Sequence, residues 1–327
     1  MFKVLITTVP FGEKIDTPIQ LLKETGVNYV INPLGRKLKE DELAELITEF
    51  DAVIAGTEII SERVMDKAKS LKLISRVGVG LDGVDLMAAK KRGITVSYTP
   101  DAPAPAVAEL TIALIMSLLR SVHLANIEMH RGEWRRHFGR RISEVTIGII
   151  GVGRIGGLVA KKLTEFANPR ILINDLYPNS NRLSETYGEW VSKEKIYLEA
   201  DVISLHVPLT VQTKNMIREK QLFMMKKDAI IVNTARGGII NEEDLVKVMK
   251  FGQLSGVAID VFNNEPYTGN LSSLDNCLLT SHMGSMSIDC RSQMEIEATQ
   301  EVIRFFRGNP LQNVVPNNEY EIQFQGL

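Results

Sequence analysis

The sequence predicts an α/β protein with two doubly wound domains, each built on a parallel sheet, and three observations support this. The chain has 327 residues, which exceeds one average domain. Short runs rich in β-branched residues alternate with longer amphipathic segments, as in βαβ units whose sheet is covered on both faces. The alternation occurs in two successive series, one before about residue 100 and one after about residue 145.

Hydrophobic periodicity places the expected elements of both series. In the first, the expected strands are 3–7, 51–56, 72–80 and 93–98, with helices at 17–26 and 39–50. In the second, the expected strands are 145–151, 170–175, 200–206, 229–235, 254–261 and 277–282. A last helix is expected at 291–308, where the glycine and proline of "GNPLQNVVP" end it.

A long helix from about Ala106 to Arg131 is expected between the two series. Its first half is apolar on nearly every face, so it must be buried on all sides. Two explanations are open: the helix lies inside one large domain, or it also packs against a second subunit.

Composition limits the possible partners and compartments. The net charge of −2 and the pI near 6.3 give no electrostatic reason to expect nucleic acid or an anionic membrane as a partner. Cys277 and Cys290 match no metal-binding spacing and no disulfide framework, so no metal is expected. The N-terminal "MFKVLITTVP" lacks the basic region and long apolar core of a signal peptide. We therefore expect a soluble, cytoplasmic protein.

A glycine-rich turn indicates a dinucleotide site. Gly151, Gly153 and Gly156 follow an expected strand, open a helix and lead to a second strand that ends in Asp175. In this context the first glycine permits the tight turn, the second lets a pyrophosphate approach the backbone, and the third lets helix and strand pack closely. A carboxylate at Asp175 would accept hydrogen bonds from ribose hydroxyls and repel a 2′-phosphate. The segment "NDLYPN" (174–179) has no adjacent arginine to receive such a phosphate, so the sequence favours NAD over NADP.

Three later strands end in residues suited to hydride-transfer chemistry: Arg236, then Asp260 and Glu265, then His282. Because the carboxyl ends of parallel strands face one crevice, we expect these residues to lie together there. Imidazole can give and take the proton that accompanies a hydride. A carboxylate beside it would orient the ring, and a guanidinium would bind a substrate carboxylate and carbonyl oxygen.

The motifs "GIIGVGRIG", "HVPLT", "VNTARGG", "DVFNNEP" and "TSHMGS" resemble those of the NAD-dependent D-isomer-specific 2-hydroxyacid dehydrogenases. The resemblance extends to "RVGVGLDGVD", "AVAELT" and "GNPLQNVVP", and so covers nearly the whole chain. It implies a catalytic triad of Arg236, Glu265 and His282, and a substrate carboxylate held by Arg236 and the backbone amides around Val79 and Gly80.

The resemblance also implies a cofactor site, in which Asp260 contacts the nicotinamide amide. The implied cofactor-binding positions are Gly151, Gly153, Arg154, Ile155, Gly156, Asp175, the turn His206-Val207-Pro208, Thr213, Ala235, Asp260 and Gly284.

The family fold implies a particular organisation of the chain. A flavodoxin-like substrate domain would comprise residues 1–99 completed by 289–327, with a Rossmann-type NAD-binding domain inserted at 100–288. Family members are commonly homodimers through the helix near 107–131, which favours a second subunit as its partner.

The sequence departs from the family pattern at a few positions. Ser281 replaces the usual proline before the histidine, Pro103 replaces a frequent asparagine, and Met286 stands where a smaller residue is common. The segment "IAGTE" (54–58) lacks the arginine that phosphoglycerate dehydrogenases tend to carry. These changes leave the expected catalytic groups in place and count against 3-phosphoglycerate as substrate.

The expected function is reversible reduction of a 2-oxo acid to a D-2-hydroxy acid with NADH. Two alternatives share the fold. One is an NAD(H)-sensing binding module like the C-terminal-binding corepressors, and the other is a relative that acts on formate or phosphonate.

Overall fold

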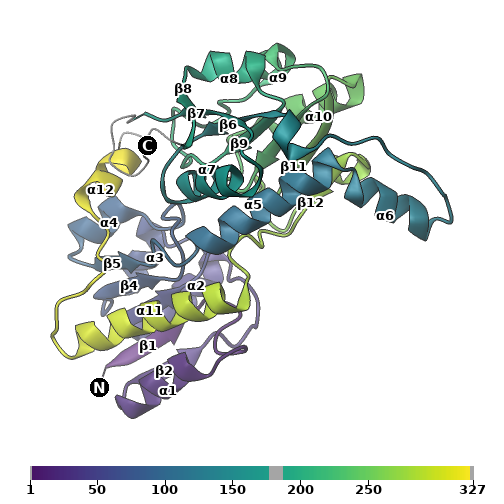
Figure 1. Cartoon of the computed structure of the whole chain (residues 1–327). Coiled ribbons are helices and arrows are strands. Elements are labelled where there is room, and N and C mark those ends of the chain that lie inside the picture. Colours follow the sequence, from purple (N-terminus) through teal and green to yellow (C-terminus); the bar gives the residue numbers. More distant parts are fainter. Residues whose placement is uncertain (1, 177–186, 325–327) are drawn as a thin grey trace. The chain divides into compact units, whose positions relative to one another are not determined.

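The computed structural model describes residues 2–176 and 187–324. The chain forms two compact units. The first unit comprises Met1–Pro103 and Met286–Leu327, and the second comprises Ala104–Ser285. Each unit contains one all-parallel sheet (Figure 1), as the sequence predicts.

The sheet of the first unit has the order β2-β1-β3-β4-β5, the flavodoxin-like arrangement. Its strands are β1 (Lys3–Ile6), β2 (Asn28–Ile31), β3 (Ala52–Ala55), β4 (Leu73–Arg76) and β5 (Thr95–Tyr98). β3 and β4 are buried throughout, because helices cover both faces of a parallel sheet. β2 was not expected from the sequence; it lies at the sheet edge and is largely exposed.

Helices of the first unit come from both ends of the chain. They are α1 (Thr17–Glu24), α2 (Glu40–Leu46), α3 (Glu62–Lys67), α4 (Leu86–Lys91), α11 (Ile288–Phe306) and α12 (Asn317–Phe324). α11 contacts α1 and β4, and Ser75 of β4 donates a hydrogen bond to the carbonyl of Ala298 (2.8 Å). The C-terminal segment therefore completes the core of the first unit (Figure 1).

The sheet of the second unit has the order β12-β11-β10-β9-β6-β7-β8. Its strands are β6 (Thr146–Ile150), β7 (Arg170–Asn174), β8 (Glu189–Trp190), β9 (Val202–Leu205), β10 (Ala229–Asn233), β11 (Leu254–Ile259) and β12 (Cys277–Leu279). From β8 to β11 this is the strand order of the Rossmann fold. The chain first adds β7 and β8 on one side of β6, and then adds β9, β10 and β11 on the other side. β12 extends the sheet by one strand next to β11.

The helices of the second unit are α5 (Ala104–Leu119), α6 (Val122–His130), α7 (Arg154–Ala167), α8 (Lys193–Glu199), α9 (Glu219–Met224) and α10 (Glu242–Phe251). Most of them cover this sheet, whereas α6 contacts α5 and extends away from the sheet (Figure 1). α5 contacts α7, β10 and β11. This contact buries one side of α5, including Val107, Thr111 and Leu118.

The single helix expected from Ala106 to Arg131 is wrong. The structure has two helices there, α5 and α6, bent by 66° at a break after Leu119. Ser121 adopts a left-handed conformation (φ 52°), which a continuous α-helix cannot contain. Burial on all sides, which the apolar first half predicts, is not found within the described chain: α5 is buried on one side, and no residue of α6 is buried.

Within the described residues, no single helix has both the length and the hydropathy needed to cross a membrane. α5 and α6 reach those values only when they are taken together across their bend.

Candidate functional site

The glycine turn joins β6 to α7, and two of its glycines are required by close backbone contacts. Gly151 has φ 93°, and a Cβ there would lie 2.6 Å from the carbonyl carbon of His206. A Cβ on Gly156 would lie 1.9 Å from the Gly151 carbonyl oxygen. These clashes would push α7 away from the ends of β6 and β9, so both positions need glycine.

Gly153 has a different reason to be glycine. A Cβ at this position would meet no atom of the described residues within 4 Å, apart from its neighbours along the chain, so the space beside it is open. Gly153 is also the N-cap of α7, and no side chain caps this helix end. Arg154 and Ile155 begin the helix and are half-buried. An uncapped helix N-terminus beside an open glycine is a suitable cradle for a pyrophosphate.

Asp175 follows β7 and lies against the glycine turn, where its Oδ2 accepts a hydrogen bond from the Val152 amide (2.7 Å). The carboxylate is thus placed beside the turn, as a ribose-binding residue would be. The sequence argument against a 2′-phosphate used residues up to Asn179, and positions 177–179 lie outside the described residues.

A second turn follows β9 and contains the implied cofactor positions of "HVPLT". Thr213 fixes this turn, because its hydroxyl donates to the Pro208 carbonyl (2.6 Å) and accepts from the Thr210 amide (2.7 Å). Val207 lies next to Gly151, with a methyl 2.9 Å from where a Cβ would stand. The two turns are therefore neighbours at the carboxyl ends of β6 and β9.

His206 lies in the same turn and carries a buried ring nitrogen. Its Nε2 is hydrogen-bonded to the Ser204 hydroxyl (2.8 Å), whereas its Nδ1 is buried and has no partner among the described residues. Burial lowers the pKa of His206 to about 3, because the charged ring would lose its hydration. The side chain is consequently neutral at physiological pH.

Arg236 lies in the turn after β10, and Asn233 fixes the backbone of that turn. The Asn233 side chain accepts from the Ala235 amide (3.1 Å) and donates to the Arg236 carbonyl (2.9 Å). Arg236 is half-buried, and its Nη1 donates to the Ala235 carbonyl (2.6 Å). The turn therefore has a defined backbone conformation from which the arginine side chain extends.

Glu265 and His282 form a direct pair. His282 Nδ1 lies 2.8 Å from Oε2 and 3.0 Å from Oε1 of Glu265. Glu265 Oε1 also accepts from the Phe262 amide (3.1 Å), which holds the carboxylate in place. Because Nδ1 is engaged by the carboxylate, Nε2 on the other side of the ring is the nitrogen available for proton exchange.

Asp260 fixes the loop that carries His282. It is 1% exposed. Its Oδ1 accepts from the Thr280 hydroxyl (2.6 Å) and the Met283 amide (2.8 Å), and its Oδ2 accepts from the Gly284 amide (3.0 Å). Its carbonyl accepts from the His282 amide (2.8 Å), where the histidine adopts φ 51°. A nicotinamide contact by Asp260 remains a prediction, and the carboxylate already has three donors.

The turns of Arg236 and Glu265 are in contact. A Cβ on Gly237 would lie 2.1 Å from the carbonyl group of Phe262, so only glycine allows this approach. β10, β11 and β12 are adjacent in the sheet, and the three side chains follow their carboxyl ends. The structure thus brings the turns of the expected triad together within the second unit.

Val79 and Gly80 belong to the first unit, in the loop after β4. Gly78 precedes them with φ 132°, and its amide donates to the Thr99 hydroxyl (2.7 Å). Val79 and Gly80 are half-buried. The loop is fixed at its start and presents its next backbone amides at the carboxyl end of the strand.

Sequence reasoning missed the supporting residues of the site. Asn233, Thr280 and Gly237 all lie inside the quoted motifs, but their roles depend on contacts with the next turn or within their own turn. A polar residue at the end of an apolar strand was the signal that could have identified Asn233 and Thr280.

Comparison with known proteins gives consistent matches. Residues 112–284 match the model of the D-isomer specific 2-hydroxyacid dehydrogenase NAD binding domain. The D-3-phosphoglycerate dehydrogenase of Methanocaldococcus jannaschii is 36% identical over 322 residues, which are 96% of this chain and 59% of that protein. The hydroxypyruvate reductase of Thermotoga maritima is 35% identical over 275 residues, 82% of this chain and 88% of that protein.

A solved structure agrees with these matches. The crystal structure of D-lactate dehydrogenase from Aquifex aeolicus, complexed with NAD and lactic acid, has a TM-score of 0.82 and 26% identity. The alignment covers 96% of this chain and 98% of that one. The matched family region, 112–284, contains the glycine turn, Asp175, Arg236, Glu265 and His282.

Proposed function

Because the chain belongs to the D-isomer specific 2-hydroxyacid dehydrogenase family, we propose that Arg236, Glu265 and His282 interconvert a small 2-oxo acid and its D-2-hydroxy acid. The chain is an NAD-dependent enzyme of this family, and its second unit contains the NAD-binding domain. The observation that carries the proposed roles is the pairing of His282 Nδ1 with Glu265 at 2.8 Å. That pairing leaves Nε2 to exchange a proton with the substrate oxygen.

The glycine turn has the shape and polarity that a dinucleotide requires. The open space at Gly153 and the uncapped N-terminus of α7 would hold the pyrophosphate, and Asp175 would hold the ribose. When it is bound, NADH supplies the hydride that reduces the substrate carbonyl carbon.

In reduction, His282 would donate the proton from Nε2 to the carbonyl oxygen as the carbon accepts the hydride. In oxidation, the same nitrogen would remove the hydroxyl proton. Glu265 would hold the ring in orientation and stabilise its positive charge. Arg236 would bind the substrate carboxylate and carbonyl oxygen through its planar group of donors.

The substrate carboxylate also needs amide donors. By the family resemblance we assign Val79 and Gly80 to this role, since glycine-flanked amides form anion-binding concavities. The curated relatives suggest the size of the acid: one is named hydroxypyruvate reductase, and others are named glyoxylate reductase. Position 56 is a glycine in "IAGTE", which argues against recognition of a phosphate there.

A panel of 2-oxo acids tests this proposal. NADH oxidation would be followed with glyoxylate, hydroxypyruvate, pyruvate and 3-phosphohydroxypyruvate, beside NAD reduction with formate and with phosphite. Turnover of a 2-oxo acid supports the proposed reaction. Turnover of formate or phosphite alone would favour a relative of the formate- or phosphonate-type dehydrogenases. Tight NADH binding with no turnover of any substrate would favour an NAD(H)-sensing binding module.

We also infer that two copies of the chain associate through α5, α6 and the segment that follows. We call residues 104–138 the arm. Large apolar side chains are exposed on this arm, among them Val122, Met129, Trp134 and Phe138. The arm lines a groove of about 260 Å³ with Leu118, Leu119 and Leu124 among its walls. Exposed apolar patches of this kind mark interfaces between proteins.

The mass in solution tests the association. Light scattering should give about 73 kDa, twice the chain mass of 36.5 kDa. Trp134→Ser combined with Phe138→Ser should shift the protein toward the monomer, whereas Phe166→Ser, at another exposed phenylalanine, should not. A parent protein that is monomeric at micromolar concentration would exclude this interface.

A further inference from the structure

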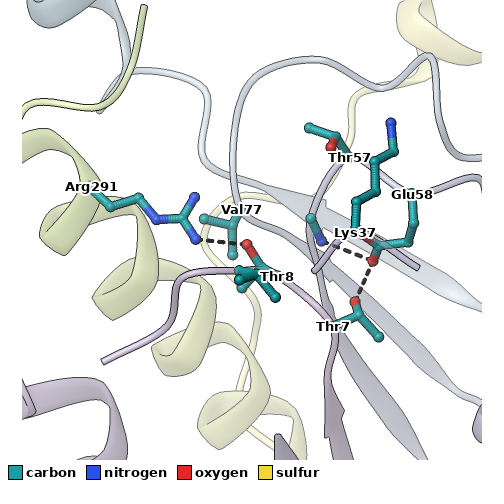
Figure 2. A pocket seen from close by; sticks show the side chains of 9 residues that line it. Thr7, Thr8, Lys37, Thr57, Glu58, Val77 and Arg291 are labelled. Atoms are coloured by element: carbon teal, nitrogen blue, oxygen red, sulfur yellow. Dashed lines mark hydrogen bonds between the residues drawn. The ribbon is translucent and has the colours of Figure 1, made fainter. Parts of the chain in front are cut away.

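The first unit contains a small polar cavity at the carboxyl ends of three of its strands. Thr7 follows β1, Gly56 follows β3 and Val77 follows β4, and all three line the cavity. The cavity has a volume of about 70 Å³, and about 10–15 Å³ is enough for one water molecule. Figure 2 shows the lining side chains Thr7, Thr8, Lys37, Thr57, Glu58 and Arg291.

Glu58 is fixed in one position at this cavity. The residue is only 2% exposed. Its Oε1 accepts from the Gly56 amide (2.9 Å) and from the Thr7 hydroxyl (Figure 2). Its Oε2 accepts no hydrogen bond from the described residues. Because the residue is almost completely buried, a bound group that supplies a donor to this oxygen would be stabilised here.

Arg291 is fixed on the α11 side of the same cavity. Its side chain is 11% exposed. Nε donates to Glu295 (2.7 Å), and Nη2 donates to the Thr8 hydroxyl (2.8 Å) and to the Pro10 carbonyl. Nη1 donates to no atom of the described residues. The cavity therefore offers a free acceptor at Glu58 and a free donor at Arg291.

The charges around the cavity balance. The carboxylates of Glu58 and Glu295 match the cations of Arg291 and Lys37, and Lys37 is exposed. With no surplus positive charge, and with a carboxylate in its wall, the cavity disfavours an anionic group. Because its free groups are an acceptor and a donor, it suits a neutral group that can both donate and accept hydrogen bonds, such as a hydroxyl.

We propose that this cavity is a subsite for a neutral, hydroxylated side chain of the substrate, so that the enzyme prefers 2-oxo acids with hydroxyls beyond the reacting carbonyl. This inference rests on the proposed function. Val77 lines the cavity, and the same loop continues to Val79 and Gly80, to which we assign the substrate carboxylate. One hydroxyl would donate to Glu58 Oε2, and another would accept from Arg291 Nη1.

Three acids with the same five-carbon chain separate the possible side chains. These are 4,5-dihydroxy-2-oxopentanoate, the apolar 2-oxopentanoate and the anionic 2-oxoglutarate. We expect kcat/KM for the dihydroxy acid to exceed both others by about tenfold or more, the effect of one hydrogen bond to a charged group. Glyoxylate, which has no side chain, is measured beside them to report the basic reaction.

Two variants assign the preference to the cavity. Glu58→Gln keeps an acceptor for the Gly56 amide but replaces the free oxygen with a donor. It should lower the ratio of the dihydroxy acid to 2-oxopentanoate about tenfold. Thr57→Val removes an exposed lining hydroxyl to which no substrate hydroxyl is assigned, so it should change the same ratio less than Glu58→Gln does. Glu49→Gln, at an exposed glutamate of the first unit, is the matched control and should leave the ratio unchanged.

The other outcomes overturn the inference in distinguishable ways. A preference for 2-oxoglutarate that rises in Glu58→Gln would show an anionic side chain, and a preference for 2-oxopentanoate would show an apolar one. Equal use of all three acids, with glyoxylate reduced normally, would remove the subsite and leave the proposed function intact. Failure to reduce glyoxylate and all three acids would overturn the proposed function itself and the subsite with it.

Discussion

Replacement of Asp260 by asparagine tests whether this carboxylate positions His282, the proposed proton donor. In the structure its two oxygens accept three hydrogen bonds, all from Thr280, Met283 and Gly284 around His282. An asparagine has the same size but only one oxygen. The amino group of the asparagine must therefore face the backbone amide of either Met283 or Gly284. Both groups are donors, so no hydrogen bond can form between them.

The size of the effect follows from these contacts. At least one hydrogen bond to a charged group is lost, and such bonds contribute about 1.5–3 kcal/mol. The two amides of Met283 and Gly284 lie on different oxygens, so no orientation of the asparagine satisfies both. For a domain of this size about 1 kcal/mol shifts the melting temperature by about 2–4 °C, so we expect it to fall by about 3–12 °C. The loop would also shift His282, and a misplacement of about 1 Å can cost about 100-fold in rate.

The assay separates positioning from cofactor binding. We expect Asp260→Asn to lower kcat for 2-oxo acid reduction about 100-fold, while the Kd of NADH changes by less than about threefold. Thr280→Val, which removes only one of the donors, is the matched control and should have a smaller effect on kcat. If Asp260→Asn keeps its kcat and loses only NADH affinity, the carboxylate acts on the nicotinamide, as the family resemblance implies, and the positioning argument is wrong.

Four further changes probe the remaining groups. His282→Ala should lower kcat about 10²–10⁴-fold with little change in NADH binding, and near-normal turnover would exclude it as the proton donor. Arg236→Lys should raise KM and lower kcat, because lysine cannot form two parallel hydrogen bonds; unchanged kinetics would place the arginine outside the site. Asp175→Ala should narrow the gap between NADH and NADPH affinities, and equal affinities in the parent would contradict the ribose assignment. Burial lowers the pKa of His206 from 6.5 to about 3, so the folded state excludes a proton that the unfolded chain binds. Its contribution to stability is present above pH 6.5 and is lost as the pH falls toward 3, by about 2 kcal/mol at pH 5. His206→Gln should flatten the melting temperature between pH 7 and 5, and an equally steep decline in the variant would refute this.

The order of elements could be predicted because both sheets are parallel. Strands such as β3 and β10 are buried on both faces, which produces continuous apolar runs between amphipathic helices. The two strands that were missed, β2 and β8, lie at sheet edges. β2 is mostly exposed and β8 has two residues, so neither produces a run that stands out in the sequence.

The break between α5 and α6 shows a different limit of sequence reasoning. The composition of 104–130 is helical throughout, and no glycine or proline stands near the break at Ser121. The bend follows from packing: α5 is buried against α7 and the sheet, whereas α6 has no buried residue and continues beyond them. The hydrophobic pattern of the sequence shows which helical residues are apolar. It does not show where the protein surface against which the helix packs comes to an end.

The positions of the three proposed catalytic residues could be predicted from the sequence, but those of the residues that hold their turns could not. Arg236, Glu265 and His282 follow three adjacent parallel strands. Because the carboxyl ends of parallel strands lie at the same end of the sheet, topology alone places these residues close together. Their orientation depends instead on contacts across or within turns, such as Gly237 against Phe262, which no local pattern specifies.

Two buried polar residues show how the fold holds these turns. Asn233 is 2% exposed and Asp260 is 1% exposed, and each comes at the end of a buried strand, β10 or β11. Each uses its side chain to bind backbone groups of a turn that carries a residue of the proposed triad: Asn233 binds the turn of Arg236, and Asp260 binds the loop of His282. An apolar residue of similar size would pack equally well in the strand, but it would leave those buried amides without acceptors. The polar residues at these two strand ends are therefore explained by the conformation of the turns rather than by the stability of the sheet.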